Sequence, residues 1–508
     1  MSKLSELLPA GASGKTIEAV ATATITSKKP VILNSAGTVT QVGESTTSPS
    51  MPLGTQTQFA NRNTQANDIA SDPHNSNRWI IAWNDDDGTD NVFLRIITLS
   101  GTTWTLSSEI NMGLAGSTTR TPAVAWDNAT ANKIVVTYNN NSNDGSAKVG
   151  TISGSAGSET IAWGSEHTFT TQTMYASSRT PPQLLCLDSS GNYLQTFVGA
   201  TGYDTTVYGI ILQAPSTTIT SGSETTLTST AKAGMSSASI VPTDSTKVIF
   251  GYLQNTQEKP AIKQLSISGT SITAGSENVG ATAAGDEGMS LIAMNATTTV
   301  MITNTNGTKY PAYQILTNSS GSFSFSTFTT ITSSTSNYVQ ASNNLSGDSS
   351  VFILSYNNQT GTRYSRAKVG TINAGISSIS FNTETQLSTT VMGNYATIAQ
   401  QSDGAGTFAY IFEPSTNNEG LIVLGQTGGT ATNLTATNYV GIADAAISTS
   451  ATGTIIVQGG TVTGLSSLTT GSKYYVQADG TFGTSAGSPS VSAGLAISTT
   501  SLILNGDS

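Results

Sequence analysis

The chain has few charged residues, two histidines and a single cysteine. Of its 508 residues, 20 are Lys or Arg and 30 are Asp or Glu, so 10% are charged, whereas about 25% is usual. Long helices and coiled coils depend on Glu, Lys and Arg, so this scarcity argues against an α-helical protein. A net charge of −10 argues against a nucleic-acid binder, because such proteins neutralise phosphates with Lys and Arg.

The scarcity of cysteine and histidine limits the possible chemistry. Cys186 stands alone, which excludes a disulfide framework and a multi-cysteine metal site. It lies in a short apolar run and is predicted to be a small core residue. His74 falls in a predicted turn and His167 in a predicted strand. We therefore expect no zinc site, no Ser/His/Asp or Cys/His catalysis and no cofactor.

Long apolar stretches are also absent. No segment approaches the roughly 18 apolar residues that a membrane helix needs, and the N-terminal residues lack the continuous apolar core of a secretory signal. The expectation is a protein made in a cytoplasm, without membrane insertion, that reaches the outside only by assembly or lysis.

Thr, Ser and 50 Gly dominate what is present, and the 36% of hydrophobic residues fall in short runs between turns. This pattern predicts an all-β protein. A Ser-Glu signature recurs every 51–58 residues and ends in these positions: Glu109, Glu166, Glu224, Glu277 and Glu384, with Phe328 in the same slot. That period is slightly longer than the roughly 40–50 residues of a four-stranded propeller blade.

Each repeat is predicted to hold an apolar first strand, a second strand, a loop, a third strand and a fourth strand that carries the signature. Seven pairs of first and second strands predict a seven-bladed β-propeller over residues 51–429; stacked β-sandwiches are the alternative. The seventh repeat lacks its own fourth strand. Residues 54–59 resemble residues 222–227 and are predicted to close the ring by pairing into the last blade, which removes two open sheet edges.

Residues 1–50 and 430–508 differ from the repeats. The first segment holds one predicted hairpin, and the second holds five or six short strands with an Asp479-Gly480 turn. Because an isolated hairpin is marginal, the two segments are predicted to form one small β-barrel or sandwich, with the propeller inserted into it.

Several parts of these end segments resemble a small β-domain of tailed-bacteriophage virion proteins, particularly of phages from marine cyanobacteria and other marine bacteria. The resemblance is carried by residues 1–11, 29–40, 438–448, 468–481 and 493–498. It implies a fibre, spike or capsid-decoration protein with partners in the capsid or tail. It implies no catalytic residues, and the propeller resembles no named family.

One acidic loop is a candidate ion site. Asp85, Asp87 and Asp90 offer oxygen ligands that suit Ca²⁺, although calcium-loop spacing around Gly88 would require a ligand at Trp83. We interpret the loop as a solvated turn and keep calcium as the alternative.

Enzyme candidates are weak. Residues 187–193 faintly resemble the aspartate turn of sialidase propellers. Sialidases also need a cluster of arginines to hold the substrate carboxylate, and the spacing of the arginines in this sequence does not indicate such a cluster. A glycosidase with paired carboxylates remains an alternative, whereas the repeated glutamates are predicted to be spread around the ring as a structural feature.

Aromatic residues give the better indication of binding. Those within strands are predicted to be core, whereas the loop tyrosines are candidates for stacking on sugar faces: Tyr175, Tyr203, Tyr310 and Tyr364. The leading hypothesis is a non-enzymatic, multi-copy virion surface protein that docks by its terminal β-domain and displays a propeller for weak, multivalent binding of host glycans. A carbohydrate-active propeller enzyme on the tail is the second hypothesis, and a cellular adhesin is the third.

Overall fold

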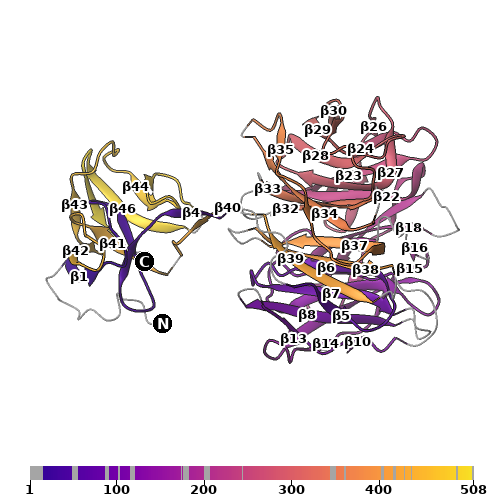
Figure 1. The fold of residues 1–508 in the computed structure, drawn as a ribbon, viewed down its shortest axis with the longest axis horizontal. Coiled ribbons are helices and arrows are strands. Elements are labelled where there is room, and N and C mark those ends of the chain that lie inside the picture. The colour runs from indigo at the N-terminus through magenta and orange to yellow at the C-terminus, as the bar shows by residue number, and fades with distance from the viewer. Residues whose placement is uncertain are drawn as a thin grey trace. The chain divides into compact units, whose positions relative to one another are not determined.

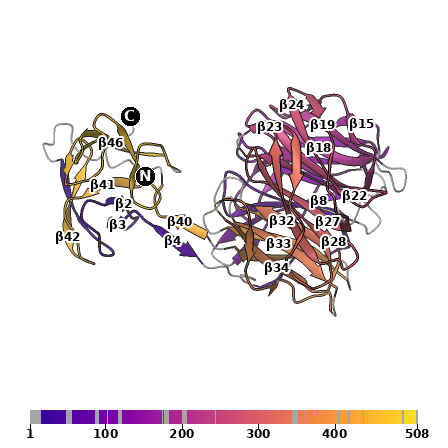
Figure 2. The same ribbon diagram turned by 90° about the horizontal axis from the view of Figure 1, so that it is seen from above.

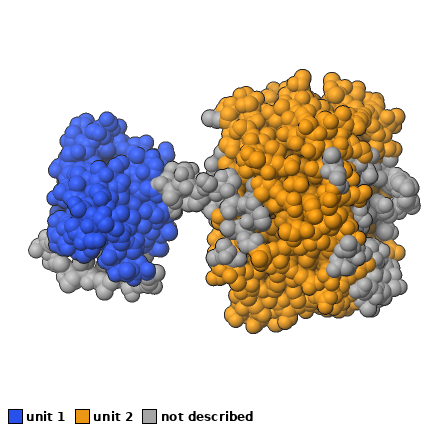
Figure 3. Space-filling model, viewed as in Figure 1, with its two compact units in different colours: residues 1–47, 429–508 blue, residues 48–428 orange. Residues whose placement is uncertain are grey.

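The structure is a computed structural model of the 508-residue chain. It describes residues 15–47, 55–85, 91–100, 103–114, 121–172, 174–175, 182–199, 206–242, 244–343, 351–359, 362–373, 375–401, 406–415, 419–427, 429–435, 437–487 and 490–505. Every regular element in them is a β-strand, which confirms the all-β prediction. None of these residues forms a helix that is long and apolar enough to cross a membrane. The chain divides into two compact units, residues 1–47 with 429–508, and residues 48–428 (Figure 3).

The described part of unit 2 contains seven antiparallel sheets (Figures 1 and 2). The first holds β6 (Thr64–Ser71), β7 (Arg78–Asp85), β8 (Val92–Ser100), β9 (Thr103–Leu106) and β10 (Ile110–Asn111). The second holds β11 (Ala123–Trp126), β12 (Lys133–Asn139), β13 (Gly145–Ser153), β14 (Thr160–Trp163) and β15 (His167–Thr170). The third holds β16 (Met174–Tyr175), β17 (Gln183–Cys186), β18 (Asn192–Gly199), β19 (Val207–Gln213), β20 (Thr220–Ser221) and β21 (Thr225–Thr228).

The remaining four sheets repeat this order. The fourth holds β22 (Ala231–Val241), β23 (Asp244–Gln254), β24 (Pro260–Ser268), β25 (Ser271–Ala274) and β26 (Asn278–Val279). The fifth holds β27 (Ala284–Ala293), β28 (Thr298–Thr305), β29 (Pro311–Ser319), β30 (Ser322–Phe325) and β31 (Thr329–Thr330). The sixth holds β32 (Ser336–Asn343), β33 (Val351–Asn358), β34 (Ser365–Ile372), β35 (Ile379–Phe381) and β36 (Thr385–Gln386). The seventh holds β37 (Met392–Gln400), β38 (Thr407–Pro414), β39 (Gly420–Gln426) and β5 (Thr57–Ala60).

The seven sheets form a closed ring, so unit 2 is a β-propeller, as predicted. The first strands of successive sheets contact one another in the order β6, β11, β17, β22, β27, β32 and β37, and β37 contacts β6 again. A separate cluster of buried apolar side chains lies between each pair of neighbouring sheets. Second strands are enclosed on both faces, which is why β12 is buried along its whole length and holds the apolar run Ile134–Val136.

Side chains of one sheet satisfy the free edge of the next. A first strand is an edge strand, whose outward N–H groups would otherwise lack partners. Four equivalent side chains accept a hydrogen bond from a backbone N–H of the following sheet: Asp68 from Val124, Gln183 from Ala238, Ser237 from Leu291, and Ser290 from Ala341. These bonds tie the sheets together around the axis of the ring.

The Ser-Glu signature marks a break in the outer edge of a sheet, so its placement within a fourth strand is corrected. In the second sheet, Glu166 lies between the short strands β14 and β15, and both pair with β13. The carboxylate of Glu166 accepts a hydrogen bond of 2.6 Å from the hydroxyl of Tyr138, at the end of the second strand. Tyr252 with Glu277, and Tyr356 with Glu384, repeat this pair. The glutamate is therefore not part of the strand pairing, and its carboxylate instead binds a tyrosine of the second strand of the same sheet.

An N-terminal strand completes the seventh sheet. β5 pairs antiparallel with β39, with Leu421 opposite Gln58 and Ile422 opposite Thr57. The buried ring of Phe59 lies where a side chain on Gly420 would be, so this strand approaches closely only because residue 420 is glycine. The last sheet is thus built from both ends of the propeller segment.

Unit 1 contains two five-stranded sheets, of which the first combines strands from both ends of the chain. One has the strand order β1 (Thr16–Val20), β42 (Thr452–Val457), β41 (Tyr439–Ala443), β2 (Pro30–Leu33) and β3 (Val39–Gln41). The other has the order β43 (Thr461–Thr463), β47 (Ser501–Leu504), β46 (Val491–Ser498), β44 (Lys473–Val476) and β45 (Phe482–Gly483). A third pair, β4 (Glu44–Thr47) with β40 (Gly429–Thr432), forms a two-stranded ribbon.

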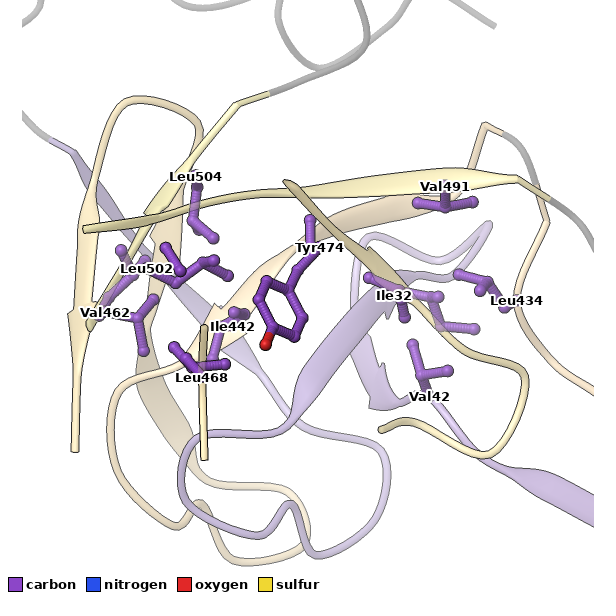
Figure 4. Close-up of a cluster of buried hydrophobic side chains, with 14 residues drawn as sticks. Ile32, Val42, Leu434, Ile442, Val462, Leu468, Tyr474, Val491, Leu502 and Leu504 are labelled. Atoms are coloured by element: carbon purple, nitrogen blue, oxygen red, sulfur yellow. The ribbon is translucent and has the colours of Figure 1, made fainter. Parts of the chain in front are cut away.

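A shared core holds the two sheets of unit 1 together (Figure 4). Ile32 from the N-terminal segment and Ile442, Tyr474 and Leu502 from the C-terminal segment are buried in one cluster. The hydroxyl of Tyr474 is not left unpaired, because it accepts a hydrogen bond of 2.8 Å from the backbone N–H of Thr469. Neither segment has this core by itself, so each depends on the other for burial.

Candidate functional site

The propeller has two ends that differ in their loops. We call the end with the turns between first and second strands the turn face; it includes Pro73, Asn128 and Pro242. We call the opposite end, with the loops between second and third strands, the loop face; it includes Tyr310 and Tyr364. Because neighbouring strands are antiparallel, these two sets of connections must lie at opposite ends of every sheet.

A central cavity of about 690 Å³ runs along the first strands and reaches the turn face. All seven sheets contribute to its lining. Among the polar side chains that line it are these: Asp68, Gln183, Ser239, Ser290, Gln340, Ser342, Thr397, Gln400 and Gln401. The sequence patterns did not single out this site, because its polar residues are isolated positions that come from separate repeats.

Asp68 is the most unusual group in the cavity. Its Oδ1 accepts a hydrogen bond of 2.9 Å from the N–H of Ile69, and its Oδ2 accepts one of 2.8 Å from Val124. The side chain borders the cavity but lies deep inside the ring. Burial raises the pKa of Asp68 to about 7, although both backbone hydrogen bonds act to lower it. Asp68 therefore changes charge close to neutral pH.

Asp72, the second carboxylate of the lining, directly follows the end of β6 and is already ion-paired. Its Oδ2 lies 2.5 Å from Nη2 of Arg78, and the Arg78 guanidinium stacks 4.8 Å from the ring centroid of Trp126. Four residues of extended strand separate Asp72 from Asp68, which corresponds to about 13 Å. Retaining and inverting glycosidases hold their carboxylates about 5–5.5 Å and 6.5–9.5 Å apart, so this pair has neither spacing. The described lining contains no arginine.

The turn at residues 187–193, which faintly resembles a sialidase turn, is a structural clamp. Oδ1 of Asp188 accepts the N–H of Ser190, and its Oδ2 accepts a hydrogen bond of 2.8 Å from Nδ2 of Asn192. The equivalent Asp127 is bound by Lys133, at 3.0 Å, and by the hydroxyl of Tyr193, at 2.7 Å. Burial acts to raise the pKa of Asp127, but these bonds hold it below its usual value.

Cys186 and the two histidines each have their own surroundings. The Cys186 thiol is largely enclosed beside the Asp127 turn, and burial raises its pKa to about 12. Nε2 of His74 lies 2.9 Å from the backbone oxygen of Asp127, and Nε2 of His167 lies 3.0 Å from Oγ of Ser221. The described residues contain no group of three His, Cys, Asp or Glu side chains that suits a metal ion.

Of the three aspartates in the acidic loop, the structure describes Asp85, the last residue of β7. Asp85 is buried, and its Oδ2 lies 2.8 Å from Nη1 of Arg62, which also contacts Glu109 at 3.1 Å. Asp87 and Asp90 lie outside the described residues. The Asp85 carboxylate is thus engaged by an arginine in the structure, and calcium binding at this loop stays a hypothesis.

The predicted tyrosines are only partly described. Tyr310 and Tyr364 are half-buried on the loop face, in the corresponding loops of the fifth and sixth sheets. Tyr203 lies outside the described residues, and for Tyr175 only the backbone, which pairs with Val198, is described. A smaller cavity of about 290 Å³ adds polar groups to the same face: it is lined by Gly113, Leu114, Asn140, Asn141, Ser142, Lys148 and Glu166.

Comparisons with known proteins give distant structural likenesses. No protein-family model matches the chain, and no curated protein matches its sequence. A Burkholderia pseudomallei lectin, BP39L, is similar in structure with 10% identity, 75% of this chain and 98% of that chain covered, and a TM-score of 0.47. Sqt1 from Chaetomium thermophilum gives 11% identity, 74% and 97% coverage, and a TM-score of 0.45.

An Aleuria aurantia lectin, solved as a variant in complex with Fucα1-6GlcNAc, gives 13% identity, 66% and 99% coverage, and a TM-score of 0.38. Likenesses at these identities and scores say nothing about the ligand of this chain.

Proposed function

We propose that this chain is a non-enzymatic surface protein of a tailed-phage particle, in which unit 1 docks to the capsid or tail and the propeller binds host glycans weakly and in many copies. The observation that carries the proposal is the insertion itself. The two ends of the chain form one unit with its own core, and Thr47 pairs directly with Gly429 where the propeller is inserted. Such an arrangement suits one anchored unit and one displayed unit.

The topology of unit 2 supports display through the loop face. β39 ends at Gln426 on the turn face, where the N–H of Thr427 bonds to the backbone oxygen of Gly406. The chain leaves the ring there, and β5 enters the seventh sheet beside it. The loop face carries Tyr310, Tyr364 and the smaller polar cavity. Because the chain leaves the ring at the turn face, the connection to unit 1 does not start among these aromatic rings and amides. These groups suit weak carbohydrate contacts that many copies strengthen by avidity.

Labelling of virions tests the docking. Gold-labelled antibodies against the purified protein should decorate particles of the phage whose genome encodes this chain, on the head or on the tail. Docking of a weakly charged β-unit relies on packing and hydrogen bonds, so the label should persist after a wash in about 1 M NaCl, where the Debye length is about 3 Å. Unlabelled particles would refute the virion location, and loss of the label in the salt wash would refute the mode of docking.

A glycan array tests the binding. Protein displayed on beads should retain glycans that the single protein does not, because avidity multiplies weak affinities by about 10²–10⁴. Tyr310→Ala and Tyr364→Ala should weaken this retention, whereas Tyr475→Ala, a half-buried tyrosine of unit 1, should not. Equal retention by all three variants would place the site elsewhere, and no retention on beads would refute glycan binding.

A further inference from the structure

The central cavity carries one carboxylate that no described cation balances. The titratable side chains in its lining are Asp68, Asp72 and Cys186. Asp72 is paired with Arg78, and the Cys186 thiol, whose pKa is raised to about 12, is neutral near pH 7. The lining holds no lysine, arginine or histidine among the described residues. Above about pH 7 the cavity therefore has a net negative charge that comes from Asp68.

The charge of Asp68 is not needed for the structural bond that it makes. Gln183, Ser237 and Ser290 accept the same sheet-to-sheet hydrogen bond at equivalent positions, and all three are neutral. A carboxylate in this enclosed place costs free energy that an amide or a hydroxyl does not. Each carboxylate oxygen accepts one backbone N–H and keeps capacity for another donor. A ligand with a positively charged donor would use both the charge and this capacity.

The turn-face end of the cavity offers further acceptors. Gln400 and Gln401 are among its lining residues, and the Oε1 atom of each has no hydrogen-bond partner within the described structure. Both side chains are at least nine-tenths buried and both Oε1 atoms are covered by protein, so a ligand in the cavity reaches them only when the amides turn toward it. Their Nε2 groups are occupied, since Gln400 donates to Thr427 and Gln401 to the backbone oxygen of Arg78. Arg78 in turn bonds to Asp72, so these amides lie level with Asp72, about 13 Å along the strand from Asp68.

We propose that the central cavity binds a linear aliphatic polyamine, with one ammonium group paired with Asp68 and a second accepted by the side-chain amides of Gln400 and Gln401. The methylene chain would lie between the two ends, against half-buried apolar side chains such as Leu185 and Ile240. This site is separate from the loop face and does not depend on the proposed glycan binding.

Titration calorimetry with spermidine tests the proposal. The measurement belongs at pH 8, where Asp68 is charged because its pKa is about 7. Arg78 and Asp85 on the adjacent β7 are ion-paired, and the described side chains of β11 and β37 contribute no further titratable group. We expect saturation at one spermidine per chain, and no binding of 1,8-octanediol, a neutral chain of similar length.

Variants decide whether the binding is specific. Asp68→Asn should weaken spermidine binding at least tenfold, whereas Asp444→Asn, which removes the same charge from a surface ion pair of unit 1, should leave it unchanged. If Asp68→Asn does not fold, Thr397→Arg serves instead, because it places a cation in the cavity lining and should abolish binding. Absence of binding, equal binding by these cavity variants, or an equal loss in Asp444→Asn overturns the proposal.

Discussion

The ring of Phe59 stands edge-on against the indole of Trp83, with the ring centroids 5.3 Å apart and the planes at 67°. Phe59 belongs to the strand that completes the seventh sheet, and Trp83 belongs to the first sheet. Both side chains are fully buried in one cluster with Ile422 and Leu424. The contact therefore joins the last sheet to the first, in addition to the backbone pairing of β5 with β39.

Phe59→Ala should lower the free energy of unfolding by about 3–5 kcal/mol, because it removes a buried aromatic ring and leaves a cavity between two sheets. Urea unfolding followed by tryptophan fluorescence measures this loss. Thr57→Ala, on the same strand but half-buried, should cost less than about 1 kcal/mol. Deleting residues 54–59 should abolish cooperative melting of the propeller; an unchanged melt would show that the ring does not depend on this strand.

Tyr356→Phe should lower the free energy of unfolding by about 1.5–3 kcal/mol, the usual cost of losing a hydrogen bond to a charged group. The Tyr356 hydroxyl is buried and donates to Glu384, and burial raises its pKa. After the change, Arg366, 3.8 Å from Glu384, is the cation that remains near that carboxylate. The same substitution at Tyr364, a loop tyrosine, is the control. Equal stability of the two variants would show that the pair contributes nothing.

The repeats could be read from the sequence because each blade uses the same local pattern. Second strands with uninterrupted apolar runs, such as Ile134–Val136 within Lys133–Asn139, require burial on both faces, and that requirement is visible in the residues themselves. The role of the signature glutamate was not visible. Its partner, Tyr138 for Glu166, lies 28 positions earlier, and only the antiparallel pairing of the second and third strands brings the two together.

The stability of the propeller should fall as pH rises from about 4 to 7. The pKa of Asp68 is raised from an ordinary value near 3.9 to about 7 in the folded chain. Across that interval the folded state keeps a proton that the unfolded state has lost, so a higher pH favours unfolding. Asp68→Asn should flatten this part of the profile. Unfolding midpoints of both proteins at pH 5 and pH 8 provide the measurement, and parallel profiles would contradict the assignment.

Unit 1 should fold without the propeller. Thr47 and Gly429 are paired neighbours in the β4–β40 ribbon, so replacing residues 48–428 by an Asn-Gly turn should connect the two strands as a hairpin. The shortened chain should melt cooperatively because its core lies within the unit. Residues 429–508 alone should not, because they lack β1, β2 and β3. A cooperative melt of that fragment would show that the N-terminal segment is dispensable.

The candidate sites were harder to predict than the fold. The sequence suggested candidate sites at the turn of Asp188 and at the loop of Asp85. In the structure these carboxylates bind side chains of the chain itself, Asn192 and Arg62. The sequence did not suggest Asp68 as a site residue. Nothing in a local stretch of sequence shows that a single polar residue will face a cavity shared by seven sheets. Its surroundings come from first strands up to about 330 positions away, which no local pattern encodes.

The insertion of the propeller at the paired residues Thr47 and Gly429 has a consequence for damage to the chain. Two covalent connections join the units, so one proteolytic cut in either connection leaves the propeller attached through the other. A cut in the first connection also leaves β5 held in the seventh sheet by its pairing with β39. Release of the propeller requires both connections to be cut, and neither terminus of the chain has to bear the load between the two units.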